Sequence, residues 1–290
     1  MRYRLASCHK EYLRQANKTS QALQASGEPH ELMYDSGAFT AWSQGKEVDL
    51  DELVRTYDDM LERYEPKAHA VWLISLDKIP GERGRTASPA EIDEACRISD
   101  VNFEALQKRY GDRVLPIFHQ NESDDRLHEV AAMAPYICVS PRNDLHEGSR
   151  RTWAAEVHRK IPGKNTHGLA ATGYDMMRLV PWGSVDSATW VMLAANGSVF
   201  RDLKLRALQV SDQSGAIKDR DQHFRTLPPA QQAIFRAEVE ARGFTIEGLE
   251  AGFYDRMIFN RVMMTETYRA LPSPEEIAAS IPVEEGLFGL

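Results

Sequence analysis

Residues 70–119 read AVWLISLDKIPGERGRTASPAEIDEACRISDVNFEALQKRYGDRVLPIFH, and this stretch decides the fold class. It begins with an apolar, β-rich run at 70–77 and ends with a second such run at 113–119. Between them, Ser88 is the expected N-cap of a helix, Glu91 stands at capping-box spacing, and a glycine is the expected stop. A strand, a helix and a strand in this order predict two parallel strands joined by a crossover helix.

The same alternation continues on both sides of this stretch. The segment VDLDELVRTYDDMLERY (48–64) predicts a second helix, because it opens with acidic residues and repeats apolar residues at intervals of three and four. Eight strand candidates lie at 2–7, 31–35, 70–77, 113–119, 136–140, 167–171, 184–191 and 203–210.

Eight strands alternating with helices favour a closed (β/α)8 TIM-type barrel over an open, doubly wound sheet. A doubly wound nucleotide-binding sheet is expected to carry a glycine-rich turn after its first strand. Here that turn reads SCHKEY (7–12) and has no glycine. We therefore expect an α/β fold, built as a (β/α)8 barrel with additional C-terminal helices.

The C-terminal part of the chain differs in character. Residues 227–243 and 249–271 predict two helices, and a proline-bearing tail follows. The expected domains are a catalytic core over residues 1–212 and a helical segment over residues 213–290, which packs on the barrel or completes it. The tail from about residue 272 is expected to be mobile.

The composition is that of a globular protein, with 42% hydrophobic and 27% charged residues among 290. A net charge of −8 argues against a non-specific electrostatic grip on nucleic acid, because phosphate contacts depend on clustered lysines and arginines. Local basic faces remain candidates, at Arg150–Arg151, 158–160 and 201–206.

Cysteine spacing and apolar runs indicate the cellular compartment in which the protein is expected. Cys8, Cys96 and Cys138 lie far apart, and no Cys/His cluster has the spacing of a zinc site, so no metal is expected. The start MRYRLASCHKEYLRQ holds no apolar segment of signal-peptide type, and no run approaches the roughly 18 apolar residues of a spanning helix. We expect a cytoplasmic protein without membrane contacts.

Three aspartates stand in or at the ends of predicted strands: Asp35, Asp77 and Asp186. In a barrel of this kind, active sites lie at the carboxyl ends of the strands. Chemistry at a sugar carbon uses such a set, with one carboxylate as nucleophile, one as proton carrier and one as substrate holder. A lone strand-end aspartate is also a common turn former or helix cap, and this alternative stays open.

Other polar groups follow the same strand ends. His119, Gln120 and Glu122 come after the fourth predicted strand, and Thr172 follows the sixth. Gly168 would let a flat ligand approach the backbone closely, or it fills a crowded corner of the barrel.

Several segments resemble the tRNA-guanine transglycosylase superfamily. DSGAF (35–39) is similar to the DSGGF/Y signature of these enzymes. The segments that follow in the order of that family are LD (76–77), PIFHQNE (116–122), HGLAATG (167–173) and PWGSVDSATW (181–190). The family folds as a (β/α)8 barrel and exchanges guanine in a nucleic acid for a 7-deazaguanine, which implies a pentosyltransferase.

The resemblance implies a role for each matched residue. Asp186 would be the nucleophile on C1′ of the guanosine sugar, and Asp35 would be the general acid/base. Asp77 would accept hydrogen bonds from the N1–H and the exocyclic amine of the purine. The further base-binding residues would be Gln120, Gly168, Leu169, Ser36 and His119.

The departures from the tRNA enzymes point to one branch of the superfamily. The Cys-x-Cys-x2-Cys…His zinc site of those enzymes has no counterpart here, and Ala38 and Thr40 differ from the signature. The short length and PW-x-SVDS-x-(S/T)W are similar to the compact DpdA-like DNA transglycosylases of bacteriophages. The implied substrates are DNA with a flipped guanosine and a free 7-deazaguanine such as 7-cyano-7-deazaguanine, with guanine released and no cofactor.

Alternatives remain open at this point. The same exchange on tRNA is one, a barrel hydrolase or glycosidase acting on a small nucleoside or sugar is another, and a protein that binds the base without exchanging it is a third. An accessory protein or a homodimer as partner, and a bacterial or phage-infected cell as location, also remain open. The aromatic residues beside the motifs could stack on a base or belong to the core: Tyr34, Phe39, Trp42, Trp182 and Trp190.

Overall fold

The structure is a computed structural model that describes residues 2–10, 12–81, 85–213 and 223–280. It is an α/β protein with parallel strands. By its internal contacts the chain divides into two compact units. Unit 1 comprises residues 1–142 and 156–167, and unit 2 comprises residues 143–155 and 168–290. The domain boundary predicted at residue 212 falls inside unit 2.

The strands of unit 1 follow one another in chain order. One sheet has the order β1-β2-β3-β4, and a second contains β5-β6-β7, with parallel pairing where the register is defined. The bounds are β1 (Arg2–Ser7), β2 (His30–Asp35), β3 (Ala70–Ile74), β4 (Val114–Leu115), β5 (Ile117–His119), β6 (Tyr136–Ser140) and β7 (Asn165–Gly168). The first five predicted strands are therefore confirmed.

Pro116 separates β4 from β5, because proline has no N–H to donate to a sheet. Its carbonyl still accepts from Cys138 N–H at 2.8 Å, and the neighbouring Leu115 carbonyl accepts from Ser75 N–H at 2.9 Å. The segment 114–119 thus carries hydrogen bonds to strands on both sides and joins the two sheets.

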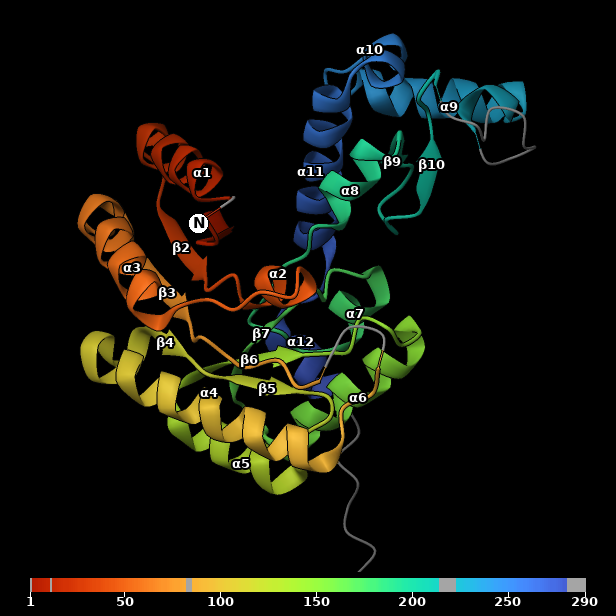
Figure 1. Cartoon of the computed structure of the whole chain (residues 1–290). Helices are drawn as coiled ribbons and strands as arrows, with labels where there is room; N and C mark the ends of the chain where they lie inside the picture. Colours follow the sequence, from red (N-terminus) through yellow and green to blue (C-terminus); the bar gives the residue numbers. More distant parts are fainter. Residues whose placement is uncertain (1, 11, 82–84, 214–222, 281–290) are drawn as a thin grey trace, which may run out of the picture. The chain divides into compact units, whose positions relative to one another are not determined.

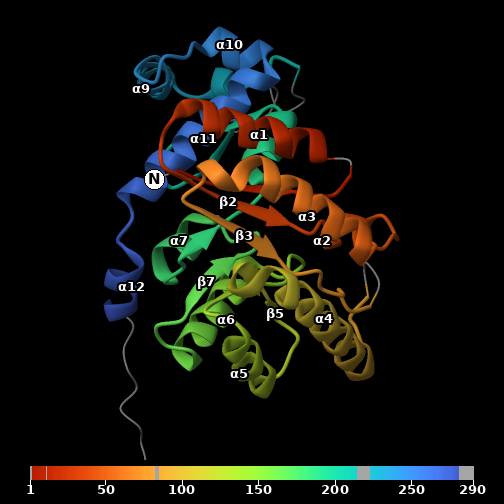
Figure 2. The ribbon, with the colours of Figure 1, turned by 90° about the vertical axis from the view of Figure 1, so that its left-hand side faces the viewer.

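Four of the helices between these strands lie on one face of the sheets (Figures 1 and 2). Their bounds are α1 (Leu13–Ser26), α3 (Leu50–Tyr64), α4 (Pro89–Tyr110) and α5 (Asp124–Met133). The predicted helix start at Ser88 is confirmed, with both capping-box bonds to Glu91 present, and Gly111 is the C-cap. The helix predicted at 48–64 is confirmed as α3, whose N-cap is Asp49.

Buried tyrosines fasten these helices to the strands. Tyr57 of α3 is fully buried, and its hydroxyl donates to the carbonyl of Ile74 at 2.7 Å, at the end of β3. Tyr34 of β2 is also buried, and its hydroxyl bonds that of Ser20 in α1 at 2.9 Å. These contacts hold the carboxyl ends of β2 and β3 beneath the loops that follow them.

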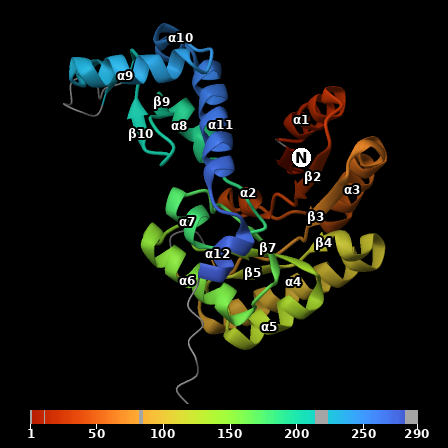
Figure 3. The same cartoon turned by 180° about the vertical axis from the view of Figure 1, so that it is seen from behind.

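Unit 2 combines short strands with most of the C-terminal helices (Figure 3). Helix α6 (Glu147–Lys160) begins in unit 2 and ends in unit 1. The other elements are α7 (Tyr174–Leu179), β8 (Ser184–Val185), α8 (Thr189–Ala195), β9 (Ser198–Phe200), β10 (Ala207–Gln209), α9 (Pro229–Glu240), α10 (Ile246–Ala251), α11 (Phe253–Ala270) and α12 (Pro274–Ser280).

Two of the predicted strands are wrong in part. The strand predicted at 184–191 ends at Val185, and helix α8 begins at Thr189, since a short apolar run has no periodicity that separates strand from helix. The strand predicted at 203–210 exists as β10 but pairs antiparallel with β9. The connection between them, residues 201–206, is too short for the crossover that a parallel pair needs.

The C-terminal helices of unit 2 enclose a core of their own. The buried rings of Phe224, Phe235 and Phe259 lie in sequence-distant elements, with centroids 5.8 Å and 6.4 Å apart in successive pairs. The helix predicted at 227–243 is confirmed as α9. The helix predicted at 249–271 is interrupted at Gly252, where α10 ends and α11 begins.

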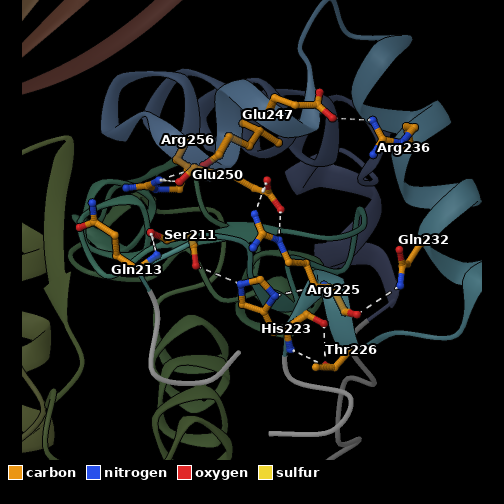
Figure 4. Close-up of polar contacts among 11 residues, drawn as sticks. Ser211, Gln213, His223, Arg225, Thr226, Gln232, Arg236, Glu247, Glu250 and Arg256 are labelled. Carbon is orange, nitrogen blue, oxygen red and sulfur yellow. Dashed lines mark hydrogen bonds and ion pairs between the residues drawn. The ribbon is translucent and has the colours of Figure 1, made fainter. Parts of the chain in front are cut away.

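The polar segment SDQSGAIKDRDQHF (211–224) is predicted to be a loop, and His223 lies near its end (Figure 4). Its Nε2 donates to the carbonyl of Ser211 at 3.0 Å, and its Nδ1 accepts from Arg225 N–H at 3.1 Å. Both ring nitrogens of this buried histidine are therefore used by the fold. Residues 214–222 of the predicted loop, and residues 281–290 of the predicted tail, lie outside the described residues.

Candidate functional site

The residues singled out in the sequence fall into two sets, one in each unit. Unit 1 carries Asp35, Ser36, Asp77, His119 and Gln120. Unit 2 carries Gly168, Leu169 and Asp186.

Asp35 is the last residue of β2 and sits on a tight turn. Its backbone carbonyl accepts from Cys8 N–H at 2.8 Å, and its Oδ2 accepts from Gly37 N–H at 3.1 Å. The second bond is that of an Asx-turn, so the structural explanation for this aspartate is supported. Ser36 is buried, and its Oγ accepts from Ala38 N–H at 3.4 Å. The turn thus holds a half-buried carboxylate at the end of the strand.

Gly37 is required by this turn. Its φ is +81°, and a Cβ placed on it would lie 2.6 Å from the Cβ of His9. Replacing Gly37 by alanine is expected to destabilise the fold by about 3 kcal/mol, from left-handed strain and from the clash. Urea unfolding measures this loss. Gly27→Ala is the matched control, since Gly27 has φ +67° with open space around it, and it should cost only about 1 kcal/mol. Equal losses in the two variants would contradict the packing role.

Asp77 and His119 form a largely buried pair at the ends of neighbouring segments. Asp77 follows β3, His119 ends β5, and His119 Nε2 lies 2.9 Å from Asp77 Oδ2. Burial alone would lower the pKa of His119, but the hydrogen bond and charge of Asp77, with the charge of Glu122, raise it above its ordinary value of 6.5. The sequence placed both residues at strand ends but did not predict that they bind each other.

The pair predicts a dependence of stability on pH. Because the folded-state pKa of His119 is raised, its stabilising effect is complete below pH 6.5 and is lost as the pH rises through the folded value. The difference in unfolding free energy between the wild type and His119→Gln should therefore be largest below pH 6.5 and should shrink over the range above it. Denaturation at several pH values tests this, with the exposed His128→Gln on α5 as control. A difference that stays constant over this range would refute it.

Gln120 and Glu122 complete the polar surroundings of this pair. Gln120 Oε1 accepts from Arg142 N–H at 2.9 Å, which leaves its amide nitrogen to donate. Burial raises the pKa of the Glu122 carboxyl, against the opposing charges of His119 and Arg126. One oxygen of Glu122 is buried without a hydrogen-bond partner among the described residues. The sequence grouped Glu122 with these residues but assigned it no role.

Asp186 directly follows β8 and is bound by the loop after β7. Its N–H donates to the Gly168 carbonyl at 3.2 Å, and its carbonyl accepts from Ala171 N–H at 3.0 Å. Its Oδ1 accepts from Ala170 N–H at 3.2 Å. These backbone contacts hold the half-buried carboxylate in a defined orientation.

Gly168 is explained by packing. A Cβ on it would lie 3.0 Å from the ring of buried Trp182 and 2.8 Å from the Cβ of Ala171. The interpretation that Gly168 fills a crowded corner therefore has direct support. The interpretation that a ligand approaches this glycine closely has no such support. Leu169, the next residue, is half-buried.

The aromatic residues beside the motifs divide between core and surface. Tyr34 and Trp182 are buried in the core. Phe39, in the short helix α2 (Ala38–Ser43) after the Asp35 turn, is 54% exposed. Its ring contacts that of Trp42 with centroids 5.7 Å apart. Phe39 is thus the aromatic residue of this group whose ring is largely exposed to solvent.

A cavity of about 740 Å³ lies in unit 2 beside the Asp186 loop. Ala170 and Ala171, whose N–H groups bind Asp186, are among the residues that line it. The sequence marked basic segments at 150–151 and 201–206 but gave no sign that they share a cavity. Its charged lining residues are Arg150, Arg178, Lys204, Arg206, Glu147 and Asp175.

The geometry defines an α/β protein with carboxylates at the ends of several strands. Comparison of the chain with models of known families, with curated proteins and with solved structures found no match. Over the described ranges, no three His, Cys, Asp or Glu side chains are grouped so as to hold a metal ion. In the same part of the chain, no helix is both long and apolar enough to cross a membrane.

Proposed function

We propose that this protein is a base-exchange transglycosylase that replaces guanine in DNA with a 7-deazaguanine. The observation that carries the proposal is the position of its acids: Asp35 ends β2, Asp77 follows β3, and Asp186 follows β8. Each lies at the carboxyl end of a strand, and each falls in a segment similar to the tRNA-guanine transglycosylase superfamily. Within that superfamily, we propose that this protein belongs to the DpdA-like branch.

The fold that we propose for this activity is a (β/α)8-type barrel with a modified last unit. Support comes from unit 1, where parallel strands follow chain order and helices α1, α3, α4 and α5 cover one face. A doubly wound sheet would reverse its strand order and carry helices on both faces. The antiparallel pairing of β10 means that residues 203–210 do not supply the eighth strand.

The proposed reaction proceeds by two displacements at C1′ of the guanosine sugar. The Asp186 carboxylate attacks C1′, the bond from C1′ to N9 of guanine breaks, and protonated Asp35 gives its proton to the departing base. The incoming 7-deazaguanine then attacks C1′ through N9 and gives its N9 proton to Asp35. Asp186 leaves as a carboxylate, and two inversions retain the configuration of the sugar.

The Asp77–His119 pair suits recognition of the guanine edge. An Asp77 oxygen that accepts from His119 is held in place, and the carboxylate can accept from the N1–H and the exocyclic amine. The amide nitrogen of Gln120, whose oxygen is occupied by Arg142 N–H, can donate to O6 of the base. Donors and acceptors are then matched along this edge.

A DNA substrate requires the nucleotide to leave the stack, because C1′ and the guanine edge are inaccessible in a duplex. The exposed ring of Phe39 is a candidate to stack on the flipped base or on its neighbour. We propose that the exchange takes place in the cytoplasm of a bacterial or phage-infected cell, without a cofactor.

The test is a label exchange. Purified protein is incubated with DNA or tRNA that contains radiolabelled guanine, together with each unlabelled 7-deazaguanine in turn, and the nucleosides are then identified by mass spectrometry. Release of guanine with a deazaguanosine appearing in DNA alone would support the proposal, and exchange in tRNA alone would favour the tRNA alternative. Release from neither, with a candidate accessory protein also added, would contradict both.

A further inference from the structure

The cavity in unit 2 has a basic lining in an acidic protein. Its cationic residues Arg150, Arg178, Lys204 and Arg206 outnumber its acidic residues Glu147 and Asp175, although the whole chain carries a net charge of −8. Its volume of about 740 Å³ falls within the range of small-ligand pockets, ~300–1,000 Å³. A local excess of positive charge in a concave site favours an anionic occupant.

Arg150 lines the cavity and is half-buried. Its Nη2 donates to the Ala170 carbonyl at 2.8 Å and lies 3.4 Å from Asn143 Oδ1. Its buried Nε has no hydrogen-bond partner among the described residues. Burial lowers the pKa of its guanidinium, and the charge of Glu147 opposes this effect. An arginine guanidinium stays protonated in proteins, so Arg150 supplies a positive charge at the wall of the cavity.

The turn between β9 and β10 presents Lys204 to the cavity, while Arg206 is paired with Asp202 of the same turn. Asp202 organises this turn, since its Oδ1 accepts from Lys204 N–H at 3.0 Å and its Oδ2 accepts from Arg206 Nε at 2.6 Å. Over the described residues, Lys204 is in no ion pair and its side chain is exposed. The turn therefore holds the lysine at the cavity without neutralising it.

Two residues with strained backbone torsions line the same cavity. In the described ranges, the non-glycine residues with positive φ are Ala170, at +53°, and Leu205, at +56°. Both line this cavity. Left-handed backbone costs free energy in residues other than glycine, and it clusters at ligand sites because the surrounding structure must enforce it.

We propose that this cavity binds a backbone phosphate of the DNA strand next to the guanosine that is exchanged. The link to the reaction is the segment at Ala170, whose carbonyl accepts from Arg150 and whose N–H donates to Asp186 Oδ1. A phosphate held by Arg150 and Lys204 would position the strand against the nucleophile. That the phosphate belongs to DNA rests on the proposed function. That the cavity binds a phosphate rests on the cavity alone.

The experiment measures binding without chemistry. Fluorescence anisotropy follows a labelled single-stranded DNA on the full chain over a series of salt concentrations. Lys204→Ala should weaken binding by about 5-fold to 10-fold at low salt and should reduce the slope of log K against log salt by about 0.7, the value for one lost phosphate contact. Arg236→Ala, on α9 and outside the cavity lining, is the charge-matched control and should change neither quantity.

The outcomes separate the two proposals. A smaller slope for Lys204→Ala supports the phosphate site, whether or not guanine exchange is detected. A slope equal to that of the wild type, or an equal effect of Arg236→Ala, overturns it even if the exchange itself is found. A loss confined to a labelled tRNA, with DNA binding unchanged, would also overturn the inference as stated.

Discussion

Replacing Asp186 by asparagine is expected to lower the rate of guanine release by about 10⁴-fold or more, because the variant lacks the proposed nucleophile. Asparagine keeps an oxygen that can accept from Ala170 N–H, so the contact of 3.2 Å that orients the side chain is retained. The amide does not form a glycosyl bond of the kind that we propose for the carboxylate. The loss should therefore appear in chemistry and leave folding intact.

Two measurements check this expectation. Radiolabelled guanine release gives the rate, and mass spectrometry of the denatured protein after incubation with DNA detects a covalent adduct on the peptide that contains Asp186. The wild type should form the adduct and Asp186→Asn should not. Asp125→Asn, an exposed aspartate of α5, is the control and should behave as the wild type. Normal turnover by Asp186→Asn would remove the nucleophile assignment.

Replacing Asn260 by alanine is expected to destabilise unit 2 by about 4 kcal/mol, because buried backbone groups lose their partners. Asn260 in α11 is fully buried, and its Oδ1 accepts from Phe200 N–H at 2.8 Å. Its Nδ2 donates to the carbonyl of Trp190 at 3.0 Å and to that of Ser198 at 3.3 Å. One side chain therefore joins α11 to α8 and to β9.

Hydrogen exchange and urea unfolding test the role of Asn260. Amide protection should fall in β9 and the N-terminal turn of α8, and the unfolding midpoint should move to lower urea. The control is Thr265→Ala on the same helix, since in the part of the chain that the structure describes the Thr265 hydroxyl bonds within α11, to the Arg261 carbonyl at 2.8 Å. A loss for Asn260→Ala no larger than that for Thr265→Ala would show that the bridge contributes little.

Local patterns were sufficient for much of unit 1. The capping box at Ser88, the acidic start of α3 and the apolar runs of the first five strands depend on neighbours within a few residues, and the structure confirms each. Asp35 and Asp77 were found in the same way, because strand ends are visible as the points where apolar runs stop. Asp186 stood inside the strand predicted at 184–191, and the structure places it directly after β8.

Unit 2 was less predictable for a physical reason. Residues 189–191 read as a strand, but they belong to α8, and the pairing of β10 with β9 depends on a turn organised by Asp202. Such choices depend on contacts between distant segments. Asn260, which holds β9, is an example, since it lies 60 residues from Phe200 in the chain.

The amino-acid order alone was enough to predict an α/β protein with alternating strands and helices, its principal helix ends, and a set of acids at strand ends, because these features arise from local periodicity and capping. Only the tertiary structure pairs Asp77 with His119 and packs Trp182 against Gly168. It also places residues of α6, the β7 loop and the β9–β10 turn around one basic cavity. These arrangements depend on the packing of sequence-distant groups and on strained backbone torsions, which no short stretch of sequence encodes.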